Sequence, residues 1–148
     1  MLVVLAFILG ACSASEPLPI PGAVGPLVTV ETRGGECFAA PCGSTIVLER
    51  NGRVHSAAKP PNELGIVVGP QFAALAGVIG VTDFAALRSR PFTGQCPTAF
   101  DGQEIVFEFG TPGRVERIAT CEVEVDYASP LFIAVANALG QWVPFPLS

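Results

Sequence analysis

The sequence contains few of the residues on which catalytic and metal sites usually depend. It has one histidine, and charged side chains make up 14% of its 148 residues. Any Ser-His-Asp or Cys-His site would have to use His55, and no G-x-S-x-G motif is present to expose a nucleophilic serine. A structural zinc site needs two closely spaced cysteine pairs, or one pair and two histidines, and the chain offers neither. We therefore expect no metal ion and no cofactor.

The sequence also lacks an apolar run long enough to cross a bilayer, which takes about 20 residues. Residues 2–9, LVVLAFIL, have instead the length of the apolar centre of a secretory signal. The residues that end this run, Leu9-Gly10-Ala11-Cys12, resemble the lipobox of bacterial lipoproteins. In that family, a signal peptidase cuts before a cysteine whose sulfur receives a diacylglycerol. The resemblance implies that residues 1–11 are a signal peptide and that Cys12 is the lipid attachment site. The alternative is an ordinary signal peptide that is cut after Ala14.

The residues after Cys12 predict a spacer and then a single domain. Residues 12–26 are rich in Pro, Gly, Ser and Ala and have no apolar periodicity, which is typical of a flexible tether. The remaining length predicts one domain over residues 27–140 and a C-terminal tail over residues 141–148. A lipid on Cys12 would anchor this domain to the outer face of a membrane in the bacterial cell envelope.

The net charge of −5 comes from the C-terminal part of the chain. Acidic and basic residues balance up to Cys96, whereas two arginines stand against seven acidic residues after it. An acidic surface repels phosphate groups, so we expect no nucleic-acid partner. A basic partner or a cation remains open, and a solvated acidic face is the simpler interpretation.

Four cysteines follow the lipobox, and on an exported chain they predict two disulfides. Three pairings exist. We expect Cys37–Cys42, which encloses the short segment FAAP, and Cys96–Cys121. The second pair follows from a predicted hairpin between these cysteines, which would bring Cys121 back towards Cys96.

Alternating apolar and polar residues predict an antiparallel sheet. Strands are expected over residues 27–31, 44–49, 54–57, 105–109 and 114–125. Asn51-Gly52 predicts a type I′ turn between the second and third of these strands, because that turn needs two positive φ angles.

Apolar residues at helical spacing predict helices over residues 70–80, 83–90 and 130–139. In the first helix, Phe72, Leu75 and Ile79 fall on one face. Thr82 is the predicted cap of the second helix, and Asp126 or Ser129 that of the third. The predicted fold class is α+β, with a mostly antiparallel sheet built from hairpins and two or three helices packed on one face.

The stretch RPFTGQCPTAFDGQE, residues 90–104, is rich in polar and turn-forming residues and contains Cys96. Long loops fixed to a rigid scaffold often carry binding surfaces. We therefore predict a binding loop here, whose side chains are Arg88, Arg90, Thr93, Gln95, Thr98, Asp101, Gln103 and Glu104.

Two groups of carboxylates support alternative functions. Asp101 and Glu104 lie close in sequence, and a pair of carboxylates can hydrolyse glycosidic bonds. Glu122, Glu124 and Asp126 would share one face of a strand, where oxygen ligands can bind a cation, although such neighbours lie about 7 Å apart.

Three segments resemble uncharacterised small secreted bacterial lipoproteins: GGECFAAPCG, TDFAALRSRPFTGQCPTAFDGQE and ATCEVEVDYASPLFIAVANAL. The resemblance implies a location but no activity. The predicted function is a membrane-anchored, non-catalytic binding or scaffolding module whose partner is an unknown envelope protein or ligand. A small envelope hydrolase that uses carboxylates and a cation-binding domain are the alternatives.

Overall fold

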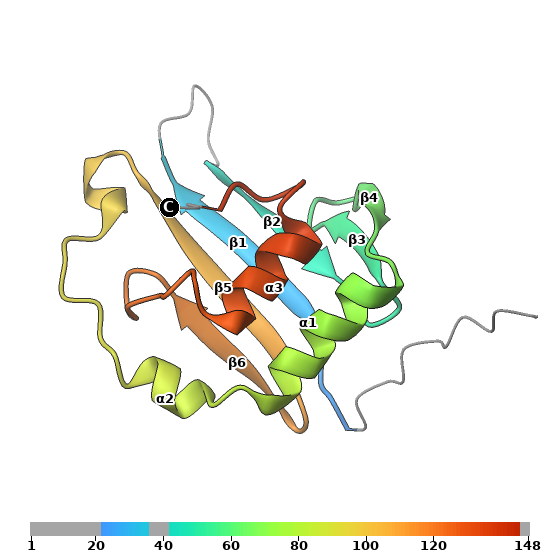
Figure 1. The fold of residues 1–148 in the computed structure, drawn as a ribbon. Coiled ribbons are helices and arrows are strands. Elements are labelled where there is room, and N and C mark those ends of the chain that lie inside the picture. The colour runs from blue at the N-terminus through green and yellow to red at the C-terminus, as the bar shows by residue number, and fades with distance from the viewer. Residues whose placement is uncertain (1–21, 36–41, 146–148) are drawn as a thin grey trace, which may run out of the picture.

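The computed structural model describes residues 22–35 and 42–145 (Figure 1). The lipobox, Cys12 and Cys37 lie outside these residues, so the predictions made for them stay predictions. The described elements follow one another along the chain as β1 (Val28–Gly34), β2 (Gly43–Leu48), β3 (Arg53–Ser56), β4 (Glu63–Ile66), α1 (Gly69–Val81), α2 (Phe84–Arg88), the 3₁₀ helix η1 (Pro97–Phe100), β5 (Gln103–Thr111), β6 (Arg114–Ala119) and α3 (Pro130–Leu139).

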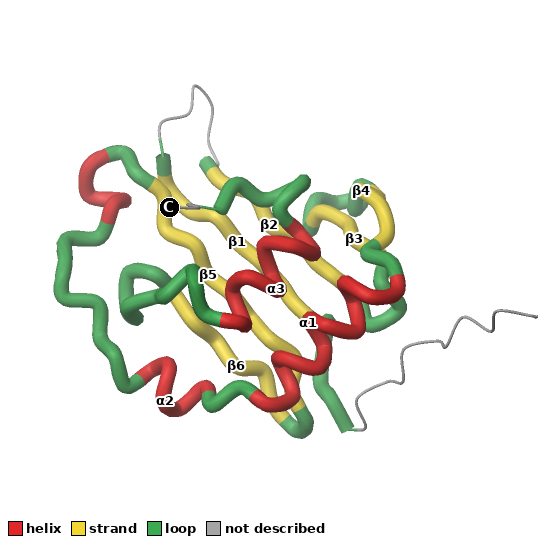
Figure 2. The backbone as a smooth tube through the Cα atoms, in the orientation of Figure 1, coloured by secondary structure: helices red, strands yellow, loops and turns green. Residues whose placement is uncertain are grey.

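The strands form one antiparallel sheet in the order β4-β3-β2-β1-β5-β6. β1 lies inside the sheet because it pairs with β2 on one side and with the distant β5 on the other. Val30, for example, lies opposite Ile46 and Phe107. Helices α1 and α3 cover one face, so the molecule has two layers (Figures 1 and 2). The α+β fold predicted from the sequence is confirmed.

The core lies between the sheet and the two long helices. Phe72, Leu75 and Ile79 of α1 are buried, as their spacing predicts. They face apolar strand residues that include Phe107, whose ring centroid lies 5.0 Å from that of Phe132 in α3. Burying a side chain of this size stabilises the fold by about 1.5–3 kcal/mol. The sheet and both helices therefore form a single rigid scaffold.

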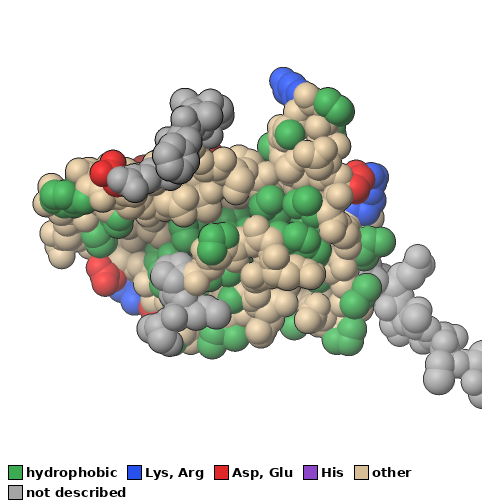
Figure 3. Space-filling view, turned by 90° about the horizontal axis from the view of Figure 1, so that it is seen from above, with side chains coloured by type: hydrophobic (Ala, Val, Ile, Leu, Met, Phe, Trp, Pro, Cys, Tyr) green, Lys and Arg blue, Asp and Glu red, His purple; other side chains and the backbone are tan. Residues whose placement is uncertain are grey.

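The residues after α3 also contact the core. Val143 is buried, and the ring of Trp142 lies over Gly65 in β4. A Cβ atom at residue 65 would come within 2.9 Å of that ring, so only glycine lets the two segments approach so closely. The view down the upper edge of Figure 1 shows mostly apolar and uncharged surface, with charged side chains towards its two sides (Figure 3).

The turn between β2 and β3 differs from the prediction. Gly52 has a φ of 85°, but Asn51 does not take a positive φ, so the predicted type I′ turn is wrong. Gly52 instead donates its N–H to the Glu49 carbonyl at 3.0 Å, and Glu49 donates its own to Arg53 at 2.8 Å. This is a three-residue loop that ends in a left-handed glycine.

Strand β4 was not predicted, and β6 is shorter than predicted. The sequence ELGI of β4 is short and contains a glycine, and it forms a strand because it pairs with β3. β6 ends at Ala119 because Val123 donates its N–H back to the Ala119 carbonyl in a turn. The prediction that Glu122, Glu124 and Asp126 share one face of a strand is therefore wrong.

The predicted helix caps need correction as well. The cap of α2 is Asp83, whose carboxylate accepts the Ala86 N–H at 2.9 Å. Thr82, the predicted cap, instead donates its hydroxyl to the Val78 carbonyl at 2.7 Å. Ser129 precedes α3 as one of the two predicted caps, but its side chain makes no capping hydrogen bond.

Candidate functional site

The predicted binding loop connects α2 to β5 along one side of the molecule. We call residues 91–102 the Cys96 loop. At its start, the backbone pairs with the segment that follows β6: Phe92 donates its N–H to Glu122 at 3.0 Å, and Glu124 donates to Arg90 at 2.8 Å. The first attachment of the loop is therefore a short antiparallel bridge.

A disulfide between Cys96 and Cys121 supplies the second attachment. Their Cα atoms lie 5.1 Å apart, and 25 positions separate them in the sequence. The predicted pairing of these cysteines is confirmed. Closing a loop of this length stabilises a protein by about 3.5 kcal/mol in the chain-entropy model. The Cys37–Cys42 disulfide stays a prediction, because Cys37 lies outside the described residues.

The helix η1 is the third attachment. Gly102 donates its N–H to Pro97 at 2.8 Å, and Asp101 between them has a φ of 58°. Thr98 lies against Gly34 at the end of β1, where a Cβ atom on residue 34 would come within 2.8 Å of the threonine methyl group. A glycine at position 34, which itself has a φ of 76°, is what lets η1 rest on the sheet.

The three attachments leave one surface of the loop in solvent. Thr93, Gln95, Thr98 and Asp101, all predicted as binding residues, are exposed. Phe100, which is not among the predicted binding residues, is 68% exposed. The available signal was an aromatic residue, one of two with Phe92, within a polar, turn-rich segment.

The four other predicted residues lie outside residues 91–102. Arg88 donates to Glu116 at 2.5 Å, and Arg114 pairs with the same buried carboxylate. This ion-pair network explains the position of Arg88. Gln103 and Glu104 belong to β5, where they lie opposite Gly34 and Arg33 of β1. The fourth residue, Arg90, lines a separate cavity.

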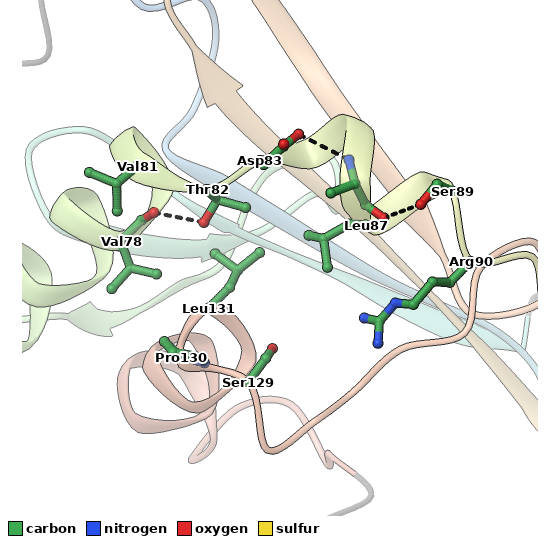
Figure 4. A pocket seen from close by; sticks show the side chains of 11 residues that line it. Val78, Val81, Thr82, Asp83, Leu87, Ser89, Arg90, Ser129, Pro130 and Leu131 are labelled. Atoms are coloured by element: carbon green, nitrogen blue, oxygen red, sulfur yellow. Dashed lines mark hydrogen bonds between the residues drawn. The ribbon is translucent and has the colours of Figure 1, made fainter.

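That cavity lies where the end of α1, helix α2 and the start of α3 meet (Figure 4). Its volume is about 510 Å³, within the range of small-molecule sites. We call it the helix cavity. It is lined mostly by apolar residues: Val78, Val81, Thr82, Asp83, Ala86, Leu87, Ser89, Arg90, Ser129, Pro130 and Leu131. This cavity is not evident from the sequence, because its walls join the neighbouring helices α1 and α2 to α3, which lies about 40 residues further along the chain.

A smaller cavity of about 310 Å³ lies under the Cys96 loop. Phe92 and Pro97 of the loop line it together with Ile105, Tyr127 and the predicted binding residue Gln103. Burial raises the pKa of Tyr127 to about 12, because removing the phenolate from water is unfavourable. Tyr127 therefore stays neutral at physiological pH and contributes an aromatic wall.

His55, the one histidine, is engaged by hydrogen bonds on both ring nitrogens. Its Nε2 lies 3.0 Å from the Glu49 carboxylate, and its Nδ1 lies 3.0 Å from the Ser56 carbonyl. Both partners are acceptors, so the doubly protonated ring suits the site. The pKa of His55 is raised by the hydrogen bond to Glu49, then by that to Ser56.

The acidic residues near the C-terminus do not converge on a cation site. Glu122 pairs with Arg117 at 2.8 Å, and Asp126 accepts the Ala128 N–H at 2.9 Å. Among residues 22–35 and 42–145, no group of three or more His, Cys, Asp or Glu side chains could hold a metal ion.

In the part of the chain that the structure describes, no helix is both long and apolar enough to cross a membrane. Comparison of the chain with protein-family models, with curated proteins and with solved structures finds no match.

Proposed function

We propose that this chain is a non-catalytic binding module of the bacterial cell envelope, anchored to the outer face of a membrane by a lipid on Cys12. In this proposal, the module contacts an envelope protein through the Cys96 loop. The anchor rests on the lipobox resemblance of Leu9-Gly10-Ala11-Cys12. A flexible spacer after Cys12 would let the domain reach its partner near the membrane.

The observation that carries the binding role is the rigid presentation of Phe100. The bridge to Val123, the disulfide and the contact of Thr98 with Gly34 fix the loop before Phe100. The hydrogen bond from Gly102 to Pro97 and the start of β5 at Gln103 fix it after Phe100. Phe100 is nevertheless 68% exposed, although burial of its ring would be favourable. A loop that is already ordered loses little entropy on binding, and exposed aromatic residues often dominate the affinity of protein interfaces.

The test is a pull-down from the native envelope with the full-length chain and with Phe100→Asp. We expect the partner recovered with the original chain to be lost with this variant, because an aspartate cannot enter an apolar pocket on the partner. Val115→Asp is the matched control: Val115 is another exposed apolar residue, at 46%, but lies on β6. Equal recovery with both variants would contradict a contact through the loop.

The anchor is tested separately by the intact mass of the mature protein. We expect the mass of residues 12–148 plus a diacylglycerol and any further acyl chain. A Cys12→Ser variant should lose the lipid and leave the membrane fraction. A mature chain that begins after Ala14 and carries no lipid would overturn this part of the proposal.

A further inference from the structure

The helix cavity joins an apolar wall to a single cationic side chain. Val78 and Val81 at the end of α1, Leu87 of α2 and Leu131 of α3 supply the wall. Arg90, an exposed residue, lies at one end of this open cavity, and Figure 4 shows its guanidinium group extending towards the space beside Leu131. Most of the arginines form ion pairs with carboxylates, so an arginine beside an apolar cavity is unusual in this molecule.

The Arg90 guanidinium has no hydrogen bond or ion pair with any side chain in the described ranges. Its neighbour Arg88 is paired with Glu116. The one acidic residue that lines the cavity, Asp83, already accepts the Ala86 N–H in capping α2. Arg90 therefore offers several N–H donors and a positive charge that nothing in this part of the protein uses.

The N-terminus of α3 lies at the same cavity. Ser129 and Pro130 line it, and no acidic residue occurs in the first turn of this ten-residue helix. The first backbone N–H groups of a helix carry a partial positive charge and have no partner within the helix. Asp126 does not line the cavity, and its carboxylate accepts the N–H of Ala128 before the helix begins.

Ser129 is a second polar residue at this end of the cavity. Its hydroxyl oxygen is buried and has no hydrogen-bond partner, the one side-chain atom of the described residues for which this holds. An unpaired buried hydroxyl is unfavourable, so a ligand group that reached it would gain a hydrogen bond. In Figure 4 the hydroxyl points from the turn before α3 towards the space between Leu131 and Arg90.

We propose that the helix cavity binds a small anionic amphiphile, a fatty-acid-like molecule with a carboxylate head and a single apolar tail. The head binds at Arg90 and the start of α3, with Ser129 as an additional donor. The tail lies along Val78 and Leu131 and replaces water on the apolar wall. A carboxylate matches the planar fork of donors of an arginine.

The experiment uses the full-length chain and a decanoate that carries a photoreactive diazirine at the end of its tail. After illumination, we expect mass spectrometry to find the label on the apolar wall, at or next to Val78, Val81 and Leu131. Unlabelled decanoate should compete for this site. Decanol and decyltrimethylammonium, which have the same tail but a neutral or cationic head, should compete at least about tenfold less well, since a charge-assisted hydrogen bond is lost.

Two pairs of variants separate the head from the tail. Arg90→Gln should raise the decanoate concentration needed for competition about tenfold. Arg53→Gln removes the same charge from an exposed arginine on β3 and should have no effect. Val81→Asp places a charge beside the tail at a residue that is 84% exposed, so folding is preserved. The matched control, Ile133→Asp, places the same charge on α3 but outside the cavity.

Every result of these experiments either supports or overturns the proposal. A loss with Arg90→Gln and Val81→Asp, but not with their controls, supports it. It is overturned if Arg90→Gln behaves like Arg53→Gln, if decanol competes as well as decanoate, or if the label falls outside the cavity. Circular dichroism melting of every variant shows that the fold is intact. Partner recovery through the Cys96 loop is measured on the same variants, so a failure of either proposal is visible by itself.

Discussion

The Cys96 loop and the helix cavity are built by opposite means. The loop is a surface segment that a covalent bond and backbone contacts hold in place, and its exposed residues lie within a short stretch of sequence. The cavity has no covalent link, and packing of three helices on the sheet creates it. The loop should therefore respond to loss of one bond, and the cavity to changes in the core.

The largest effect is expected on breaking the disulfide. A Cys96→Ser, Cys121→Ser double variant should lose about 3.5 kcal/mol of unfolding free energy, because the unfolded chain is no longer restricted. Partner recovery through Phe100 should fall, while decanoate binding remains. Chemical denaturation and the two binding assays measure these quantities. Loss of both binding activities in a folded variant would mean that the loop and the cavity are not independent.

The second prediction concerns a residue in the wall of the helix cavity. Leu131 is 3% exposed and belongs to both the core and the cavity. Leu131→Ala should lower the unfolding free energy by about 2–3 kcal/mol, because buried methyl groups are removed and a void is left. Decanoate affinity should fall and partner recovery should not. If Leu131→Ala abolished partner recovery but left decanoate binding unchanged, the expected independence of the Cys96 loop from the helix cavity would be wrong.

A smaller effect compares the starts of α2 and α3. Asp83 accepts a hydrogen bond from Ala86, so Asp83→Ala should cost about 1 kcal/mol. Ser129 caps nothing and its hydroxyl has no partner in the described chain, so Ser129→Ala should be neutral or stabilise the protein by up to about 1 kcal/mol. Urea denaturation measures both. A clear loss of stability with Ser129→Ala would show that the hydroxyl has a partner within the protein.

The smallest effect concerns His55, which lies in neither region. Its pKa is raised in the folded state, first by the hydrogen bond to Glu49, so folding favours the protonated ring. This stabilisation is complete below the unfolded pKa of about 6.5 and disappears as the pH rises through the higher folded value. Glu49→Gln should therefore lower the melting temperature more at pH 5.5 than at pH 8.5. Equal losses at both pH values would contradict the assignment, and binding at either region should not change.

The sequence predicted features that depend on neighbouring residues better than those that depend on distant ones. Helix α1 and the hairpin of β5 and β6 follow from local periodicity and a Pro-Gly turn, and both are present. Strand β4 is too short to be identified from its pattern of apolar and polar residues. It forms a strand because it pairs with β3. The strand predicted through Val125 ends early, because the chain after Ala119 turns to meet Pro91.

The residues of the candidate sites also differ in whether neighbouring or distant parts of the chain determine their roles. The exposed residues of the Cys96 loop could be named from composition, since polar turn residues cluster around one cysteine. Arg88 and Arg90 are indistinguishable in sequence, two positions apart. In the fold, one pairs with the buried Glu116 and the other lines the helix cavity. Only the packing of α2 against the neighbouring elements separates these two roles.

The sequence by itself determined the fold class, the Cys96–Cys121 pairing and the position of an exposed loop, because each follows from periodicity and chain connectivity over a few tens of residues. The tertiary structure alone decided that the Arg90 guanidinium has no hydrogen-bond or ion-pair partner among the described residues, where Phe100 projects, and that three helices line an open, mostly apolar cavity. Those outcomes depend on contacts between segments far apart along the chain, and no local pattern of side chains encodes which distant surfaces will meet.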